Sequence, residues 1–399
     1  MKIARFNFRI YPDDKQIELM NKTFGCCRWL WNQSLSFRSG EFKINHNSVS
    51  RIELSKLLTE IKTLDDYIWL KEVDAISLQQ TLIDQETAFK NFFDKRAGYP
   101  KFKSKHNRQS YRTVSVNNNI RLIDNYIKLP KLGLVKIKLH RTDFGRIHSA
   151  TVIRLSNGKY QVSLVVDYEP PVKLHTDKMV GGDLGLKEFW IGSDGNVIHN
   201  YRHFNKLQKK LASEQRRLSK CVKGSKRYEK QSRRVANIHQ KIKDCRNDFL
   251  QKLSTQLINE NQVIVVEDLK VSNMVHNHKL AKAISDAGWS KFVNMLEYKA
   301  DWYGRTLVKI PTNYPSSQLC SICGYKNPKV KNLSVRKWTC PVCGSRHERD
   351  FNAAINILTK GIKILGLGQP EDTLAESIPL PYRQDYSLKR EAYKSLVCG

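Results

Sequence analysis

The chain opens with alternating apolar and polar positions and soon changes to helical spacing. Residues 1–9 (MKIARFNFR) alternate, which predicts a strand. Pro12-Asp13-Asp14 follows, and acidic residues in the first turn are typical of a helix start. Helical spacing then continues to about residue 95 with no strand pattern in between. The first quarter of the chain is therefore expected to be one strand followed by helices.

Strand-like alternation returns over residues 113–170. Three stretches carry it: IRLIDNYIKLP, GLVKIKLH and ATVIRLSNGKYQVSLVVDYEP. Asn157-Gly158 lies between two alternating runs, which is a strong hairpin signal. This region is expected to form a small antiparallel β-barrel, with residues 1–9 as a candidate first strand.

The pattern changes again at residue 179. MVGGD reads as a strand ending at Asp183, and a hairpin is expected around residues 193–196. Residues 201–257 have helical spacing, and Gly224-Ser225 divides them into a two-helix hairpin. The two apolar stripes of the hairpin are Leu207, Leu211 and Leu218, and Val235, Ile238 and Ile242.

A continuous apolar run at Val263–Val266 predicts a strand that is buried on both faces. A helix over residues 288–304 and a strand over 306–311 follow it. Near the end of the pattern, residues 350–361 form an amphipathic helix whose buried side is expected to be Ala353, Ala354, Ile357 and Leu358.

Charge narrows the class of partner. The chain has 69 Lys and Arg against 38 Asp and Glu, a net charge of +31. Such an excess repels itself unless a polyanion neutralises it, so nucleic acid is the expected partner. The first residues hold no signal-peptide core and no run is long enough to span a membrane, so no membrane partner is expected. The predicted location is the prokaryotic cytoplasm, at the nucleoid.

Two basic regions are candidates for nucleic-acid contact. Residues 95–112 contain seven Lys and Arg and no acid, interleaved with aromatic residues, as suits a phosphate backbone with stacked bases. A disordered linker is the alternative there. The helical hairpin carries a second basic strip. On a separate helix, exposed amides could pair with adenine edges, or form an ordinary solvated face. The candidate contacts are Lys71, Gln79, Gln80, Tyr99, Lys101, Lys103, Lys105, Arg216, Arg217, Lys226, Arg227, Arg233 and Arg234.

Four of the nine cysteines form two C-x-x-C pairs, with 16 residues between Cys323 and Cys340. Each pair can hold one side of a tetrahedral ion, so Cys320, Cys323, Cys340 and Cys343 predict a structural Zn²⁺ site. With that shell full, His347 is not expected to be a ligand. Elsewhere, Cys26 and Cys27 are expected to be small buried apolar residues, and His276 and His278 are expected in an exposed polar loop.

Three acids occupy positions typical of an RNase H-like core. Asp183 ends one strand, Glu267 ends the buried strand, and Asp350 begins a helix. Carboxylate oxygens are the ligands that Mg²⁺ prefers, and two such ions can promote phosphodiester hydrolysis. Two neighbours compete: Asp268 follows Glu267, and Glu348 precedes Asp350 by two. Spacing alone does not choose within either pair.

In all these stretches the sequence resembles the TnpB family, insertion-sequence proteins ancestral to type V CRISPR nucleases. The matching segments include FRIYP, NKTFGCCRWLWN, GYPKFKSK, GGDLGLK, the basic hairpin, VVEDLKVSNM, PSSQLCSICG and CPVCGSRHERDFNAAINI. They follow one another over roughly residues 3–360. HERD stands where the family more commonly has HDRD, at a position that is not expected to be a ligand.

The resemblance implies a multidomain α+β protein: a helical recognition lobe, a β-barrel wedge, and a RuvC (RNase H-like) nuclease core with an inserted four-cysteine zinc ribbon. It assigns the catalytic, Mg²⁺-binding acids to Asp183, Glu267 and Asp350. The expected division is 1–9 and 109–175 (wedge), 10–108 (recognition), 176–317 and 346–362 (nuclease, with the Arg-rich hairpin 201–257), 318–345 (zinc ribbon) and 363–399 (C-terminal tail).

The resemblance also implies an RNA-guided DNA endonuclease. The expected partners are a guide RNA from the element end and double-stranded target DNA beside a short adjacent motif, with the protein a monomer or weak dimer. Two other functions stay open: an autonomous transposase, and an RNA-guided repressor that binds DNA without cleavage.

Overall fold

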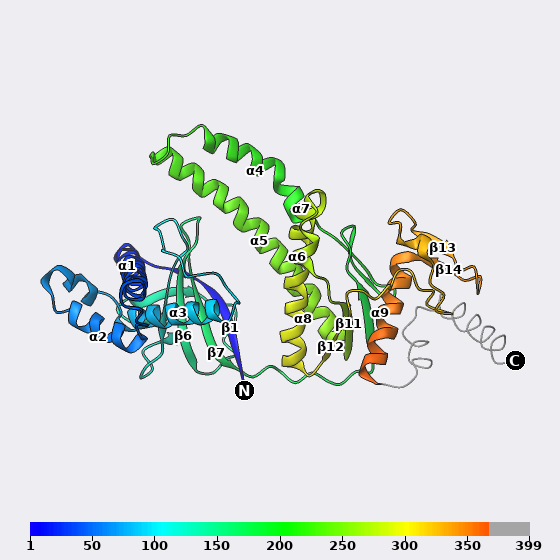
Figure 1. Ribbon diagram of the computed structural model, residues 1–399, viewed down its shortest axis with the longest axis horizontal. Helices are drawn as coiled ribbons and strands as arrows, with labels where there is room; N and C mark the ends of the chain where they lie inside the picture. The colour runs from blue at the N-terminus through cyan, green and yellow to red at the C-terminus, as the bar shows by residue number, and fades with distance from the viewer. Residues whose placement is uncertain (367–399) are drawn as a thin grey trace. The chain divides into compact units, whose positions relative to one another are not determined.

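A computed structural model of the chain describes residues 1–366 (Figure 1). Chain contacts divide it into two compact units, Met1–Glu169 and a second that begins at Pro170. Each unit has its own sheet and its own buried core. In residues 1–366, no helix is long and apolar enough to cross a membrane.

The first unit is built on a seven-stranded sheet in the order β2-β6-β7-β1-β5-β4-β3. All its pairings are antiparallel, and β1 lies at the centre, paired with β7 and β5. The predicted barrel region and the predicted first strand are thus confirmed. The two edge strands, β2 and β3, are not bonded to each other, so these described strands form a half-barrel. The strands are β1 (Lys2–Tyr11), β2 (Gln109–Val114), β3 (Arg121–Ile123), β4 (Tyr126–Leu129), β5 (Gly133–Lys138), β6 (Ile147–Arg154) and β7 (Tyr160–Tyr168).

Helices fill the interval between β1 and β2, as the spacing predicts. The first begins after Asp13, whose side chain accepts a hydrogen bond from the backbone of Gln16 while the Gln16 side chain bonds back. This capping box satisfies amide groups that the helix leaves unpaired. Cys26 and Cys27 are buried, as expected. The helices are α1 (Asp14–Asn45), α2 (Arg51–Ile61), the 3₁₀ helix η1 (Asp65–Lys71) and α3 (Ala75–Phe93).

The second unit has a five-stranded sheet in the order β10-β9-β8-β11-β12. β10, β9 and β8 are antiparallel, whereas β8, β11 and β12 run parallel. This mixed order is that of the RNase H-like fold, so the predicted core is confirmed. The strands are β8 (Met179–Asp183), β9 (Glu188–Gly192), β10 (Val197–His199), β11 (Val263–Glu267) and β12 (Thr306–Ile310).

Both faces of this sheet are covered, which explains the continuous apolar run of β11. Ile264 and Val266 pack with α5 (Lys226–Glu260) and α8 (Trp289–Tyr303). Val263 and Val265 point the other way, toward α9 (Arg349–Leu365). Figure 1 shows α9 on one side of the sheet and α8 on the other.

The basic region forms the expected hairpin of α4 (His203–Ser219) and α5. Gly224 adopts a φ of +85° in the turn, and Ser225 caps α5. The predicted stripes meet: Leu211 packs against Val235, Ile238 and Ile242. The connection after β11 differs from expectation, because α6 (Val271–Met274) and α7 (His278–Ala287) replace a polar loop. His276 and His278 are exposed, as expected, but His278 begins α7, which Asn277 caps.

Candidate functional site

Two of the predicted acids lie at the carboxyl ends of neighbouring parallel strands. Val266 of β11 pairs with Gly182 of β8, so the next residues, Glu267 and Asp183, lie side by side at one edge of the sheet. The carboxyl ends of parallel strands meet at this edge, which is where α/β proteins place their sites. Asp350 reaches the same region from the first turn of α9.

The ionised forms of Asp183 and Glu267 are disfavoured in this fold. Burial, followed by the charges of Glu267 and Asp350, raises the pKa of Asp183 to about 7, whereas Arg349 opposes the rise. Burial also raises the pKa of Glu267, although a hydrogen bond from the Ser316 hydroxyl (2.5 Å) opposes it. Half-buried carboxylates that lie side by side and resist ionisation suit a hard divalent cation.

The geometry separates each acid from its competitor. Asp268 is exposed, whereas Glu267 is half-buried and acts on Asp183. Glu348 is exposed and forms an ion pair with Lys337 (3.1 Å) across the pair of β13 (Lys337–Thr339) and β14 (Arg346–Glu348). The arrangement therefore favours Glu267 and Asp350 within the two pairs that spacing alone leaves open.

Asp350 is held by an ion pair of its own. Arg336 donates to Asp350 Oδ2 at 3.0 Å. Among the described residues, the three carboxylates do not form a cluster with all ligand oxygens within 4.8 Å of one another. A cation at this site would therefore have to compete with Arg336 for the carboxylate of Asp350.

The glycines before Asp183 serve packing within the protein. A Cβ atom at Gly181 would lie 2.5 Å from the carbonyl oxygen of Ala354 in α9, and one at Gly182 would overlap the ring of Trp190. The absence of side chains thus lets α9 lie directly against β8 and brings Asp350 toward the strand that ends in Asp183. The backbone that comes close at Gly181 is that of α9.

The four cysteines of the two C-x-x-C pairs come together. Their sulfur atoms all lie within 4.8 Å of one another, with Cys320–Cys343 and Cys323–Cys340 at 3.6 Å. The amides of Gly324 and Gly344, both at positive φ, donate to the carbonyls of Cys320 and Cys340, which closes two matching turns. Four thiolates in this arrangement fit one tetrahedral Zn²⁺.

His347 lies beside the cysteine cluster. Its Nε2 atom is 3.1 Å from the sulfur of Cys320 and 2.8 Å from the hydroxyl of Ser345, and its ring packs on Trp338. The four cysteines already supply the ligands of one tetrahedral ion. His347 is thus placed to orient a ligand, a common arrangement around zinc.

The cysteine cluster is tied directly to the acids. β13 (Lys337–Thr339) pairs with β14 (Arg346–Glu348), and β14 continues without a gap into α9. On α9, the buried amide of Asn352 bonds the backbone of Leu319 and Ser321 around the first cysteine. Asn356 bonds the carbonyl of Ser316, whose hydroxyl donates to Glu267.

Sequence reasoning missed these connecting residues. Ser316, Arg336, Asn352 and Asn356 were not predicted as parts of the site. A signal for the two amides was present, because Asn at spacing four on the apolar helix 350–361 is unusual on a buried face. Both side chains are buried.

The candidate nucleic-acid contacts divide between the two units and lie on the surface. Those of the first unit are Lys71 at the end of η1, Gln79 and Gln80 on α3, and Tyr99, Lys101, Lys103 and Lys105 in the segment before β2. Those of the second unit are Arg216 and Arg217 on α4 and Lys226, Arg227, Arg233 and Arg234 on α5. All are exposed except Gln80, which is half-buried.

The segment before β2 is ordered against α1, which argues against a disordered linker. Asn32 bonds both the backbone amide and the carbonyl of Lys103 (2.8 and 2.9 Å). The indole of Trp31 donates to the carbonyl of Lys101, and the Lys103 ammonium lies 3.5 Å from the Trp31 ring centroid. Contacts with Asn32 and Trp31 of α1 thus hold the segment in one path.

Comparison with known proteins matches three family models. Residues 163–278 match a probable transposase family (OrfB_IS605), and residues 289–357 match the Cas12f1-like TNB domain. Residues 1–46 match a helix-turn-helix domain, although in this structure they are β1 and the single helix α1.

Relatives and a solved structure match most of the chain. A Streptomyces pristinaespiralis protein named "Putative RNA-guided DNA endonuclease" is 40% identical, over 91% of this chain and 90% of its own length. An Escherichia coli K12 protein of the same name, InsQ, is 33% identical over 92% and 94%. The structure of a Cas12f1–sgRNA–target DNA complex matches with a TM-score of 0.57 at 13% identity, covering 89% of this chain and 98% of that one.

Proposed function

Because the chain belongs to the TnpB family, we propose that it is an RNA-guided DNA endonuclease encoded by a transposable element. One observation carries the proposal: three carboxylates from β8, β11 and α9 gather at one sheet edge, where the pKa of Asp183 is raised to about 7. That is the electrostatic setting of a site made for cations, and it supports an intact nuclease.

In this proposal Asp183, Glu267 and Asp350 hold Mg²⁺, with two ions at the sheet edge. Bound Mg²⁺ would supply the charge that activates a water molecule and stabilises the leaving 3′ oxygen. The Ser316 hydroxyl donates to the carboxylate of Glu267 and would hold it in place, and Arg336 would have to release Asp350 before that carboxylate could bind a cation. Zn²⁺ on the four cysteines has a closed shell and a structural role.

The proposed partners are a guide RNA from the end of the element and double-stranded DNA beside a short motif. The basic α4–α5 hairpin offers a strip for a phosphate backbone, and the exposed residues around Gln79 and Lys101 are proposed to contact the motif. The protein acts in the prokaryotic cytoplasm, at the nucleoid, as a monomer or weak dimer. The finer division into wedge, recognition, nuclease and ribbon segments belongs to the same proposal.

The test is cleavage of a plasmid by the protein purified with its own RNA. Wild type is expected to cut a plasmid that carries the RNA-matched target in Mg²⁺, and Asp183→Asn, Glu267→Gln and Asp350→Asn are each expected to abolish cutting while still binding the RNA. RNase treatment before the assay should stop cleavage. Cutting by Asp183→Asn at the wild-type rate would refute the assignment.

Two alternatives predict different outcomes in the same assay. An autonomous transposase would join DNA strands without any RNA, and would keep activity after RNase treatment. An RNA-guided repressor would occupy the target without cutting, and Asp183→Asn would keep its full biological effect. The gathered acids argue against the repressor.

A further inference from the structure

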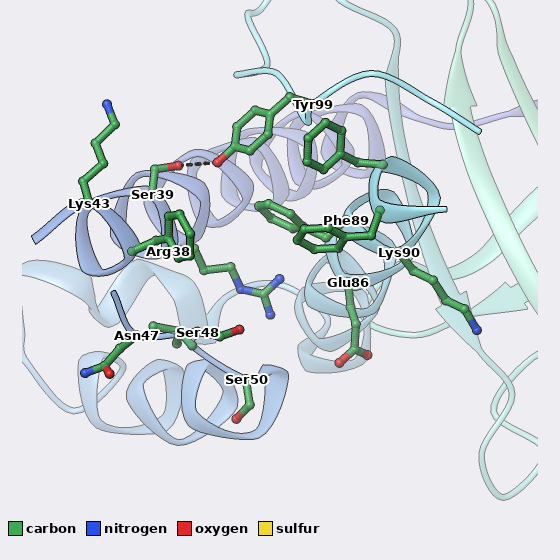
Figure 2. A pocket seen from close by; sticks show the side chains of 14 residues that line it. Arg38, Ser39, Lys43, Asn47, Ser48, Ser50, Glu86, Phe89, Lys90 and Tyr99 are labelled. Carbon is green, nitrogen blue, oxygen red and sulfur yellow. Dashed lines mark hydrogen bonds between the residues drawn. The ribbon is translucent and has the colours of Figure 1, made fainter. Parts of the chain in front are cut away.

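A cavity of about 730 Å³ in the first unit lies outside everything assigned above, except that Tyr99 lines it. It is bounded by α1, the loop that leads into α2 (residues 47–50), α3 and the segment after α3 (Figure 2). Its volume exceeds that of a single nucleobase. Six of its 14 lining residues are aromatic or apolar, four are polar and four are charged. Aromatic side chains beside a few polar groups are typical of ligand sites.

Aromatic rings form one wall. Phe92 contacts Phe93 and Tyr99, with ring centroids 5.3 Å apart in each case, and Phe89 meets Tyr99 edge-on. The Tyr99 hydroxyl bonds Ser39 of α1 (2.9 Å), which fixes its ring. Phe93 is 73% exposed and Phe42, also lining the cavity, is 61% exposed. Monomeric proteins rarely leave aromatic groups together in water without a binding role.

One cation faces the hollow. The Arg38 guanidinium lies 5.3 Å from the centroid of Phe89, and its Nε atom is buried without a hydrogen-bond partner. Burial lowers its pKa. Figure 2 shows Arg38 and Glu86 pointing into the same space, whereas Lys43 and Lys90 extend away from it. A half-buried guanidinium whose shielded Nε–H has no partner is a donor that favours an acceptor nearby.

We propose that this cavity binds one unstacked nucleobase of single-stranded RNA, with guanine preferred. The aromatic wall offers a stacking surface, and Arg38 offers donors that match guanine O6 and N7. The three basic side chains of the lining against one acid, Glu86, suit a polyanion rather than a second copy of this basic chain.

RNA is favoured over DNA because unpaired bases are typical of RNA loops and ends, whereas target DNA is mostly duplex. The inference rests on the proposed function for its RNA partner. It adds a base-reading site in the first unit, whereas the α4–α5 hairpin and the three acids belong to the second.

The test uses the full chain, stripped of RNA, and labelled oligonucleotides about nine nucleotides long. The probes are oligouridine with a central guanosine, the same probe with adenosine, and its DNA counterpart. Phe93→Ala is expected to lower the affinity for the guanosine-containing RNA roughly tenfold. The slope of affinity against salt should not change, because no phosphate contact is lost.

Matched variants separate stacking, base reading and folding. Phe37→Ala removes an exposed phenylalanine of α1 outside the cavity and should bind as wild type does. Arg38→Ala should abolish the preference for guanosine over adenosine. Arg38→Lys should abolish it too while keeping more of the affinity, since an ammonium lacks the planar fork. Because Phe93 is 73% exposed, its removal should leave the melting temperature unchanged.

Three results would overturn the inference. Equal RNA affinity of Phe93→Ala and wild type would show that no base stacks there. An equal loss on the DNA probe would show a general single-strand surface. Loss of a dimer in Phe93→Ala, seen by light scattering with RNA affinity intact, would make the cavity an interface between copies. If neither wild type nor any variant bound RNA, the proposed function itself would fail.

Discussion

Asp183 is the residue on which the account depends most. Its carboxylate is buried beside two other acids, and its pKa of about 7 lies far above the ordinary 3.8. The ionised form is therefore disfavoured in the metal-free fold. Residues that carry such shifts inside a group of acids are typical of functional sites, where a bound cation relieves the repulsion.

Asp183→Asn should stabilise the Mg²⁺-free protein at pH 8 and much less at pH 5. A raised folded pKa means that stability falls as pH rises from about 4 to about 7, and Asn removes that loss. The expected gain at high pH is about 1–4 kcal/mol, since one pKa unit corresponds to about 1.4 kcal/mol. Denaturant unfolding in buffer without Mg²⁺ at both pH values, with the Zn²⁺ of the cysteines left in place, measures it. An equal change at both pH values would show that Asp183 ionises normally.

Gly181→Ala should destabilise the fold and lower cleavage together. The added Cβ would lie 2.5 Å from a backbone oxygen of α9, so the helix that carries Asp350 must move. Such overpacking costs about 1–3 kcal/mol. Gly25→Ala in α1 is the control, because its Cβ would meet nothing within 4 Å. Thermal melts and plasmid cleavage, each relative to wild type, provide the comparison. A Gly181→Ala protein that melts and cuts as wild type does would mean that α9 does not pack on β8 as described.

At the scale of elements, the ribbon and α9 behave as one piece. β14 runs directly into α9, and Asn352 and Asn356 bond the chain that leads into the first cysteine pair. The ribbon is thereby in a position to fix Asp350 by holding the start of its helix. This is a physical reason why the proposed Zn²⁺ site lies next to the proposed Mg²⁺ site.

Cys340→Ser should lose zinc, lower the melting temperature and reduce cleavage by at least tenfold. Three thiolates hold Zn²⁺ poorly, and the ribbon has a small core around Val330 and Trp338 that depends on them. Cys221→Ser is the control, since that cysteine lies outside the cluster. Metal analysis by mass spectrometry, a melt and a cleavage assay are needed. Normal cutting by a Cys340→Ser protein with full zinc content would contradict this account.

The hairpin supplies a prediction of its own. Replacing Arg233 and Arg234 by Gln should weaken RNA binding and reduce the slope of log affinity against log salt by about 0.7 per lost phosphate contact. Both side chains are exposed on α5. Lys252→Gln, also on α5 but paired with Asp248, is the matched control. Titrations over a range of salt concentrations decide the matter, and an unchanged slope would mean that these arginines do not contact RNA phosphates.

For the molecule as a whole, the sequence predicted the charge and the order of the main elements along the chain. The run Val263–Val266 indicated a strand covered on both faces, and the two C-x-x-C pairs indicated a single cluster. The RNase H-like core was predicted from the resemblance and from Asp183, Glu267 and Asp350 at the ends of their elements. Each of these signals is local or repeats at a fixed spacing.

Contacts between distant segments could not be read. Ser316 meets Glu267 across 49 residues, and Asn352 meets Leu319 across 33. The half-barrel edges and the cavity around Arg38 depend on how several elements pack. The short helix α7 was also missed. It begins in a polar stretch, where the side chain of Asn277 caps its first turn. Such features arise from tertiary packing, which no single window of sequence contains.

The net charge of +31 favours a polyanion as the partner of this chain. The most direct test of the account is to sequence the RNA that co-purifies with the protein expressed from its native locus. The account predicts one abundant RNA species that ends in the sequence flanking the element, since that part of the RNA would pair with the target DNA. A heterogeneous mixture, or no RNA at all, would contradict an RNA-guided nuclease and leave the basic hairpin to be explained by DNA.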